Sequence, residues 1–168
     1  AMLMVIILMG VSGVGKTTVG ELLARDLDWP FHEGDDHHPP DNVLKMAHGI
    51  PLTDEDRWPW LDAIHDLVAS VIAAGKNAVI TCSALKQEYR HRLVKEHHEE
   101  VTFVYLKGDY ELIKHRLADR ADHFMNIDLL ESQFHALEEP EGTITFDVTG
   151  EPREIVDAIK QALPQGTY

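Results

Sequence analysis

The sequence predicts an α/β fold built on a parallel β-sheet, and two observations carry that prediction. Short apolar runs alternate with longer segments of helical periodicity, as in successive βαβ units. The first apolar run leads directly into a glycine-rich segment and then a helical stripe, which is typical of phosphate-binding folds. No repeat, low-complexity tract or long Gly/Ser linker divides the chain, so we expect one domain over residues 1–168.

Five segments have the composition of β-strands. Leu3–Met9 and Ala78–Cys82 are almost wholly apolar, which is typical of strands covered on both faces. The other expected strands are Pro30–Glu33, Thr102–Leu106 and Thr143–Val148.

Six segments carry apolar stripes with the three- and four-residue spacing of amphipathic helices. A long helix is expected to begin after the capping residues Thr53–Asp54 and to close near Gly75. Asp109 is a candidate N-cap, and Pro152 stands in a permitted first-turn position of the last helix. The stripes are Val19, Leu22, Leu23 and Leu27; Trp60, Leu61, Ile64, Leu67, Val68, Val71 and Ile72; Leu85, Tyr89 and Leu93; Leu112, Ile113 and Leu117; Leu130, Phe134 and Leu137; and Ile155, Val156 and Ile159. The polar stretches 34–42 and 120–126 lack periodicity and are expected to be irregular.

The charge balance excludes several classes of partner. The chain has 29 acidic residues against 15 Lys plus Arg, a formal net charge of −14. Nucleic acids and anionic membranes are held by clustered cations, so we expect neither as a partner. A phosphate-binding site in this chain would have to concentrate a few cations in one place.

Cysteine and histidine usage adds further expectations. Cys82 is the single cysteine and cannot form an intrachain disulfide, and the apolar run at residues 3–9 is too short to span a bilayer. We therefore expect a soluble cytoplasmic protein. The 11 histidines show no H-x-x-x-H spacing and no C-x-x-C pattern accompanies them, which argues against a transition-metal site.

Residues 10–17 read Gly-Val-Ser-Gly-Val-Gly-Lys-Thr and match the phosphate-binding pattern G-x-x-x-x-G-K-[ST] without a mismatch. In such a loop, backbone N–H groups and the start of the following helix surround a phosphate. Lys16 would reach the terminal phosphates, and the Thr17 hydroxyl would ligate Mg²⁺. ATP and Mg²⁺ are therefore the expected cofactors. The expected nucleotide contacts are Gly10, Val11, Ser12, Gly13, Val14, Gly15, Lys16, Thr17 and Thr18.

A phosphate-binding loop alone does not separate kinases from GTPases or mechanical ATPases. The chain has no guanine-binding N-K-x-D motif, and no acid follows the strand at residues 78–82. The second strand is instead followed by Glu33-Gly34-Asp35-Asp36, at the strand end where ligands bind in parallel sheets. Asp35 is therefore a candidate to orient or deprotonate an acceptor hydroxyl, or to hold Mg²⁺ through water. A capping role is the alternative.

Three blocks of residues resemble the gluconate kinase (gluconokinase) family. With the phosphate-binding loop they span most of residues 4–137 in the right order. The first block is Gly34-Asp35, His38-Pro39, Asn42, Lys45-Met46, Gly49, Pro51-Leu52, Asp54, Asp56-Arg57 and Pro59-Trp60-Leu61. The second is Cys82-Ser83-Ala84-Leu85-Lys86 with Tyr89-Arg90. The third is Arg116, Arg120, His123-Phe124-Met125, Leu129-Leu130, Ser132-Gln133-Phe134 and Leu137-Glu138.

The resemblance implies a P-loop NTPase fold similar to shikimate and nucleoside-monophosphate kinases. That fold has a five-stranded parallel sheet of order 2-3-1-4-5, helices on both faces and a lid, here about residues 120–137. The family uses MgATP to phosphorylate the 6-hydroxyl of D-gluconate, giving 6-phospho-D-gluconate, and is typically homodimeric. Two alternatives stay open: a related shikimate- or nucleotide-type kinase, and a non-catalytic nucleotide-binding module. Ala121 and Asp122, which stand where the family has a basic residue and glycine, motivate the second.

The resemblance also implies which residues meet the substrates. Gluconate carries a carboxylate and a chain of hydroxyls, so its pocket needs cations and hydrogen-bonding groups. The acceptor candidates are Asp35, Lys45, Arg57, Ser83 and Lys86, joined on lid closure by His123 and Gln133. Arg116 is expected near the adenine or phosphates and Arg120 on the phosphates, so the catalytic set is Lys16, Asp35 and Arg120. The alternatives are a surface ion pair of Arg57 with Asp54 or Asp56, and solvated helix faces for Lys45, Lys86 and the two lid-edge arginines.

Overall fold

Five parallel strands form one sheet in the order β2-β3-β1-β4-β5, which confirms the order expected from the family resemblance. The structure is a computed structural model that describes residues 4–119 and 127–164. Ile7 at the centre of the sheet pairs with Ile80 of β3 and with Phe103 of β4. The strands are β1 (Val5–Met9), β2 (Phe31–Glu33), β3 (Ala78–Thr81), β4 (Val101–Lys107) and β5 (Ile144–Asp147), each within one or two residues of its predicted bounds.

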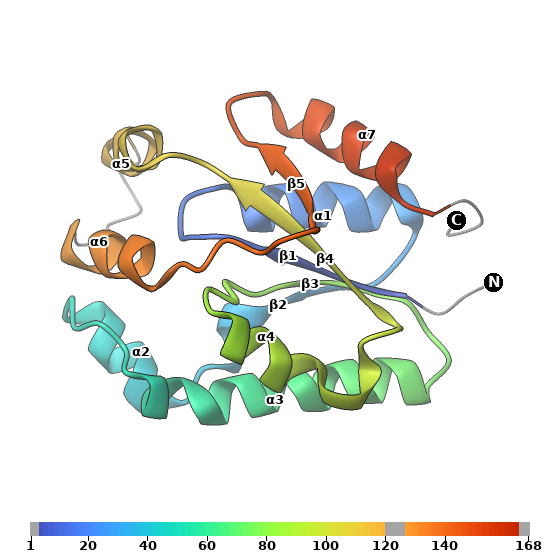
Figure 1. Ribbon diagram of the computed structural model, residues 1–168, viewed down its shortest axis with the longest axis horizontal. Coiled ribbons are helices and arrows are strands. Elements are labelled where there is room, and N and C mark those ends of the chain that lie inside the picture. The colour runs from blue at the N-terminus through green and yellow to red at the C-terminus, as the bar shows by residue number, and fades with distance from the viewer. Residues whose placement is uncertain (1–3, 120–126, 165–168) are drawn as a thin grey trace.

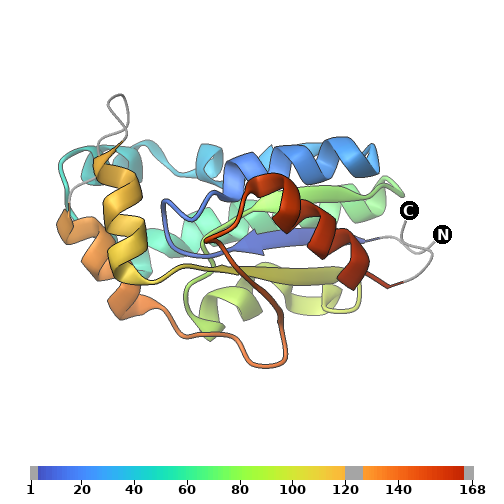
Figure 2. The ribbon, with the colours of Figure 1, turned by 90° about the horizontal axis from the view of Figure 1, so that it is seen from above.

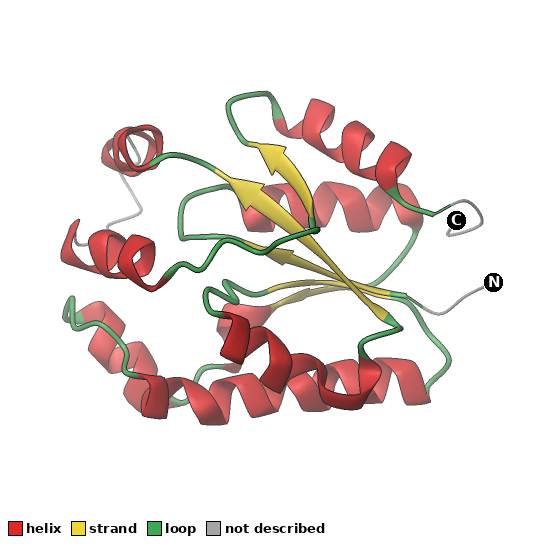
Figure 3. Cartoon of the chain, in the orientation of Figure 1, coloured by secondary structure: helices red, strands yellow, loops and turns green. Residues whose placement is uncertain are grey.

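Helices cover both faces of the sheet. Figure 1 shows α1 and α7 on one face and α3 with α4 on the other. The remaining helices α2, α5 and α6 lie beyond the end of the sheet toward which the strand arrows point, as Figures 2 and 3 show. The helices are α1 (Lys16–Leu27), α2 (Pro40–Ala47), α3 (Asp54–Ala73), α4 (Gln87–Val94), α5 (Tyr110–Ala118), α6 (Ile127–Ala136) and α7 (Pro152–Ala162), with short 3₁₀ turns η1 (Gly34–His37) and η2 (Lys95–His97).

The core is centred on the two most apolar strands. Every residue of β1 and β3 is fully buried, as expected for parallel strands with helices on both sides. Trp60 of α3 and Tyr89 of α4 are the largest side chains that are fully buried, and they pack under the sheet. None of the described helices is both long enough and apolar enough to cross a membrane.

The predicted helix ends are confirmed. The Thr53 side chain accepts from the Asp56 amide at 3.1 Å, and the Asp56 carboxylate accepts from the Thr53 amide at 2.9 Å, forming a capping box at the start of α3. Gly75 follows the end of α3 with φ of 69°. Asp109 caps α5 by accepting from the Leu112 amide at 2.8 Å.

The expectation that residues 34–42 are irregular was wrong. Gly34–His37 forms a 3₁₀ turn, and Pro40 begins helix α2. Hydrophobic periodicity did not predict this helix, because its apolar side chains do not face the core. Val43 is 51% exposed and Leu44 is 59% exposed. The other stretch expected to be irregular, residues 120–126, lies outside the described residues, so only the second part of the expected lid, helix α6, is described.

Gly34 connects β2 to the end of β3, and its environment leaves no room for a side chain. A Cβ atom there would lie 1.9 Å from the Thr81 carbonyl oxygen, a backbone atom that cannot move aside cheaply. Gly34→Ala is therefore expected to destabilise the protein by about 2 kcal/mol or more, measured by urea unfolding. Gly150→Ala is the matched control, because its Cβ would meet nothing nearer than 3.4 Å. Equal stability of the two variants would contradict this description.

Candidate active site

The phosphate-binding loop connects β1 to α1 and needs glycine at three of its positions, because Gly10, Gly13 and Gly15 all have positive φ. Gly10 and Gly13 have φ of 149° and 88°, values that side-chain-bearing residues rarely adopt. A Cβ on Gly10 would lie 2.6 Å from the Leu106 carbonyl oxygen, and one on Gly13 would lie 2.9 Å from Ile113. Val11 and Val14 are each 2% exposed, so they anchor the loop in the core and offer a ligand only their backbone.

The first turn of α1 presents its amide groups to the loop. Gly15 is the N-cap residue, and no side chain caps these amides within the described residues. Because the helix start carries a partial positive charge, this arrangement favours an anion. Thr17 and Thr18 lie in the same turn, and both are exposed. The geometry is that of the phosphate site predicted from the motif.

Lys16 lies across the loop that precedes it. Its Nζ donates to the Gly10 carbonyl at 2.9 Å and to the Val11 carbonyl at 3.0 Å. Burial lowers the pKa of Lys16, and the nearby Asp35 and Glu33 carboxylates oppose that shift. A bound phosphate would give this desolvated ammonium a full negative charge in place of two carbonyl dipoles.

Glu33 is a site residue that sequence reasoning did not single out. Its Oε2 accepts a short hydrogen bond from the Thr17 hydroxyl, and its Oε1 accepts from the Thr81 hydroxyl at 2.6 Å. The Thr81 hydroxyl in turn accepts from the Gly34 amide at 3.1 Å. Since Thr17 donates its proton to Glu33, its oxygen lone pairs remain available to a cation. The acidic cluster after the second strand was the available sequence signal.

Asp35 lies in the 3₁₀ turn that follows Glu33. Desolvation by surrounding atoms raises the pKa of Asp35 above its ordinary value, and Lys16 opposes that shift. The side chain nevertheless remains 67% exposed, so the carboxylate is open to a substrate. Asp35 also lies within electrostatic reach of Lys16 in the phosphate loop.

His38 follows the same 3₁₀ turn and packs against Trp60 of α3. Its ring stacks on Trp60 with centroids 4.2 Å apart, and its Nε2 lies 3.9 Å from an Asp35 oxygen. Burial, assisted by the positive charge of Arg57, lowers the pKa of His38 to about 4. The imidazole is therefore neutral at neutral pH, and it does not neutralise the charge of Asp35.

Two predicted acceptor residues, Arg57 and Lys86, meet around Tyr89. Arg57 donates to the Tyr89 hydroxyl and to the Leu52 carbonyl, each at 3.0 Å. Tyr89 donates a short hydrogen bond to Asp54, and the Lys86 ammonium lies 3.2 Å from the same carboxylate. The Tyr89 hydrogen bond, followed by Lys86, holds the pKa of Asp54 below its ordinary value. Two cations and one carboxylate leave a net positive charge at this point.

Arg57, Lys86 and Asp54 line a cavity of about 500 Å³ between the first turn of α3, the N-cap of α4 and the end of α6. A cavity of this size can hold a small polar metabolite. Ser132 of α6 lines it, and the neighbouring Gln133 contacts the phosphate loop, so α6 takes part in both the cavity and the contact with that loop. The lining residues are Leu52, Thr53, Asp54, Arg57, Lys86, Ser132, His135 and Ala136.

Lys45 and Ser83 are placed differently from Arg57 and Lys86. The Lys45 ammonium lies 2.7 Å from an Asp56 oxygen, which joins α2 to α3, and this contact lowers the pKa of Asp56 to about 2. Lys45 is not among the residues that line the cavity. The Ser83 carbonyl accepts from the Gly10 amide at 3.2 Å, so Ser83 lies beside the start of the phosphate loop.

Gln133 contacts the nucleotide loop in this structure. Its Oε1 accepts from the Ser12 amide at 2.7 Å, and its Nε2 donates to the Ser12 hydroxyl at 3.0 Å. Arg116 at the end of α5 donates to the Val148 carbonyl in the loop after β5. Arg120 and His123 lie outside the described residues.

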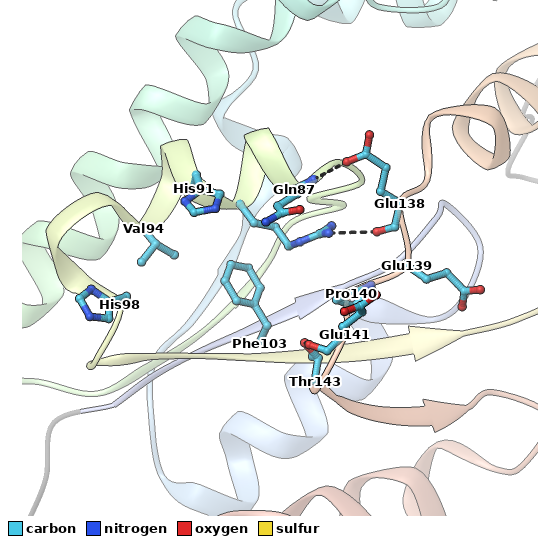
Figure 4. A pocket seen from close by; sticks show the side chains of 11 residues that line it. Gln87, His91, Val94, His98, Phe103, Glu138, Glu139, Pro140, Glu141 and Thr143 are labelled. Atoms are coloured by element: carbon cyan, nitrogen blue, oxygen red, sulfur yellow. Dashed lines mark hydrogen bonds between the residues drawn. The ribbon is translucent and has the colours of Figure 1, made fainter.

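A second cavity, of about 450 Å³, lies between α4 and residues 138–143 and is drawn in Figure 4. The backbone N–H of Gln87 donates to the Glu138 carboxylate at 2.9 Å, and the Arg90 guanidinium donates to the Glu138 carbonyl at 3.0 Å. None of its lining residues is a predicted acceptor or nucleotide contact, whereas Arg57 and Lys86 line the first cavity. These contacts fasten the chain that follows α6, and they give Arg90 a structural role.

Comparisons with known proteins agree with this geometry. A family model described as an AAA domain matches residues 5–140. A probable gluconokinase from Mus musculus is 41% identical, with 95% of this chain and 97% of that protein covered. The thermosensitive gluconokinase of Escherichia coli (strain K12) is 42% identical, covering 94% of this chain and 86% of that protein.

Solved structures give the same result. A gluconokinase from Sinorhizobium meliloti 1021 superposes with a TM-score of 0.84 at 44% identity, covering 92% of this chain and 87% of the other. Shikimate kinase from Aquifex aeolicus superposes with a TM-score of 0.62 at 20% identity over 95% of both chains, which shows a shared fold alone. A strand order, a phosphate loop and relatives above 40% identity over almost the whole chain point the same way: this protein belongs to the gluconokinase family of P-loop kinases.

Proposed function

We propose that this protein transfers the γ-phosphoryl group of ATP to the 6-hydroxyl of D-gluconate, giving ADP and 6-phospho-D-gluconate. The observation that carries the proposal is that one helix, α6, both lines a cationic cavity and contacts the phosphate-binding loop. Arg57 and Lys86 line that cavity, and α6 connects it to the loop through Gln133 and Ser12. The relatives that match most of the chain are themselves named gluconokinases.

The nucleotide end of the site uses the loop and the residues around it. Loop amides and Lys16 bind the phosphates, and Arg116 and Arg120 contact the nucleotide from the lid edge. The oxygen donors Thr17 and Glu33 fit Mg²⁺, which prefers oxygen ligands. Thr17 would ligate the ion directly, and Glu33 would fix the Thr17 hydroxyl. When bound, Mg²⁺ supplies positive charge that neutralises the phosphate oxygens.

The acceptor end must hold a carboxylate at one end of an extended polyol and a reactive hydroxyl at the other. Arg57 and Lys86 bind the carboxylate, because they are the cations of the cavity. Asp35 accepts a hydrogen bond from the 6-hydroxyl of gluconate. As the oxygen of that hydroxyl attacks the γ-phosphorus, Asp35 takes up its proton. Lys45, Ser83, His123 and Gln133 complete the proposed acceptor contacts.

The family resemblance supports two further parts of the proposal: that the enzyme is a homodimer, and that it acts in the cytoplasm. A gluconate-specific kinase is better supported than a shikimate-type kinase, because the solved shikimate kinase shares only 20% identity with this chain.

A coupled ADP-release assay tests the substrate. With MgATP present, D-gluconate is expected to stimulate ADP release, while shikimate, AMP and glycerate leave it at the background rate. The arrangement of two cations in a 500 Å³ cavity beside the loop suits a small sugar acid. No gluconate-stimulated turnover would refute the proposal, and stimulation by shikimate or AMP alone would reassign the substrate. Tight ATP binding without transfer to any acceptor would indicate a non-catalytic nucleotide-binding module.

Substitution of the two groups closest to the chemistry should reduce turnover. Lys16→Ala and Asp35→Asn are expected to lower kcat by about 100-fold or more, with smaller effects on the gluconate KM, because both act mainly in the transition state. Asp36→Asn is the matched control, since Asp36 is the exposed neighbouring carboxylate. If Asp35→Asn retained the kcat of the parent, Asp35 would not be the base.

Substitution in the cationic cavity should affect gluconate binding. Arg57→Ala is expected to raise the gluconate KM by about tenfold to 100-fold, the value of one or two charged hydrogen bonds, and to leave the ATP KM unchanged. Lys86→Met serves as a second variant, because Arg57 also supports Tyr89 and the Leu52 carbonyl. Arg92→Ala is the control, since Arg92 pairs with Asp62 and does not line the cavity. An unchanged gluconate KM in both cavity variants would place the substrate carboxylate elsewhere.

A further inference from the structure

Three side chains with metal-ligating atoms meet between α3 and the 3₁₀ turn η2. They are His65 of α3 and Glu96 and His97 of η2, and one ligand atom from each lies within 4.8 Å of the others. His65 Nε2 is 3.6 Å from Glu96 Oε1, and His97 Nε2 is 3.2 Å from the same oxygen. Ligand atoms around a tetrahedral Zn²⁺ lie about 3.3 Å apart, given bonds of about 2.0–2.1 Å. The observed separations therefore approach those of a metal site.

The hydrogen bonding of His65 orients it as a ligand. Its Nδ1 lies 3.0 Å from the Leu93 carbonyl oxygen. A carbonyl oxygen can only accept, so Nδ1 carries the proton, and in the neutral tautomer Nε2 presents its lone pair toward Glu96 and His97. Metal-ligating histidines commonly donate their other N–H to a carbonyl in this way. His65 is only 9% exposed, so this orientation is held by packing.

The other two ligands are accessible to solvent. The side chains of Glu96 and His97 are 64% and 18% exposed, which leaves an entry path for an ion and room for a water ligand. The preceding residue, Lys95, has φ of 44° and ψ of −116°, and this sharp change of direction begins η2. Asp62, the other carboxylate that interacts with His65, already binds Arg92 through both of its oxygens. Within η2, Glu96 and the neighbouring Lys95 are the charged residues next to His97.

We propose that His65, Glu96 and His97 bind one Zn²⁺ ion per chain, with water as the fourth ligand. Two imidazoles and a carboxylate suit a borderline cation such as Zn²⁺, whereas Mg²⁺ prefers oxygen ligands alone. The cluster precedes the start of β4, whereas the phosphate loop follows the end of β1 and so lies at the opposite edge of the parallel sheet. The ion would fasten the connection between α4 and β4 to α3, and it is independent of the proposed phosphoryl transfer.

Calorimetric titration of untagged, chelator-treated protein with ZnCl₂, without nucleotide, tests the site. The parent is expected to bind one Zn²⁺ per chain, and Co²⁺ in its place should give the visible absorption bands of a tetrahedral site. Glu96→Gln and His97→Ala should each weaken Zn²⁺ binding by about tenfold or more. Both positions are at least partly exposed, and the unfolding temperature without metal checks that the variants fold.

The adjacent exposed residues provide matched controls. Glu99→Gln and His98→Ala change the same residue types outside the cluster and should bind Zn²⁺ as the parent does. Zn²⁺ should raise the unfolding temperature of the parent and of these controls, but not that of Glu96→Gln or His97→Ala. The proposal is overturned if the parent shows no saturable Zn²⁺ binding, or if either cluster variant binds Zn²⁺ as tightly as the parent.

Discussion

The Glu33 carboxylate is the interaction on which the rest of the site depends. It accepts hydrogen bonds from Thr17 at the start of α1 and from Thr81 at the end of β3, so it joins three elements at one point. Gly34 is the next residue. Its amide donates to the Thr81 hydroxyl, and its carbonyl accepts from the Trp60 indole of α3 at 2.9 Å. Glu33 and Gly34 therefore fix three parts of the site relative to one another. These are Thr17, the proposed metal ligand; Asp35, the proposed base; and α3, which carries Arg57.

The strongly acidic composition is compatible with the two anionic substrates that we propose, because several of the cations lie at the proposed site. Each cation described at the site already has a partner. Lys16 donates hydrogen bonds to two backbone carbonyls. Lys45 forms an ion pair with Asp56, and Lys86 forms one with Asp54. A substrate anion must share or replace these partners, so the net charge of −14 describes the surface of the protein rather than its pocket.

The fold and the nucleotide loop could be predicted because both depend on local patterns. Continuous apolar runs marked the buried strands, and the spacing from Gly10 to Thr17 marked the loop. Helix α2 was missed because its apolar residues, such as Leu44, face solvent and leave no core-facing stripe. Glu33 was missed as a site residue because its partner Thr81 is distant in sequence. The contact of Gln133 with Ser12 and the meeting of His65 with Glu96 likewise depend on tertiary packing.

A crystal structure with D-gluconate and a non-hydrolysable ATP analogue would test most directly the claim that the cationic cavity and the phosphate loop form one site. We expect the gluconate carboxylate on Arg57 and Lys86, and the 6-hydroxyl within hydrogen-bonding distance of Asp35 and in line with the γ-phosphate. Gluconate bound outside this cavity, or with its carboxylate beside Asp35, would contradict it.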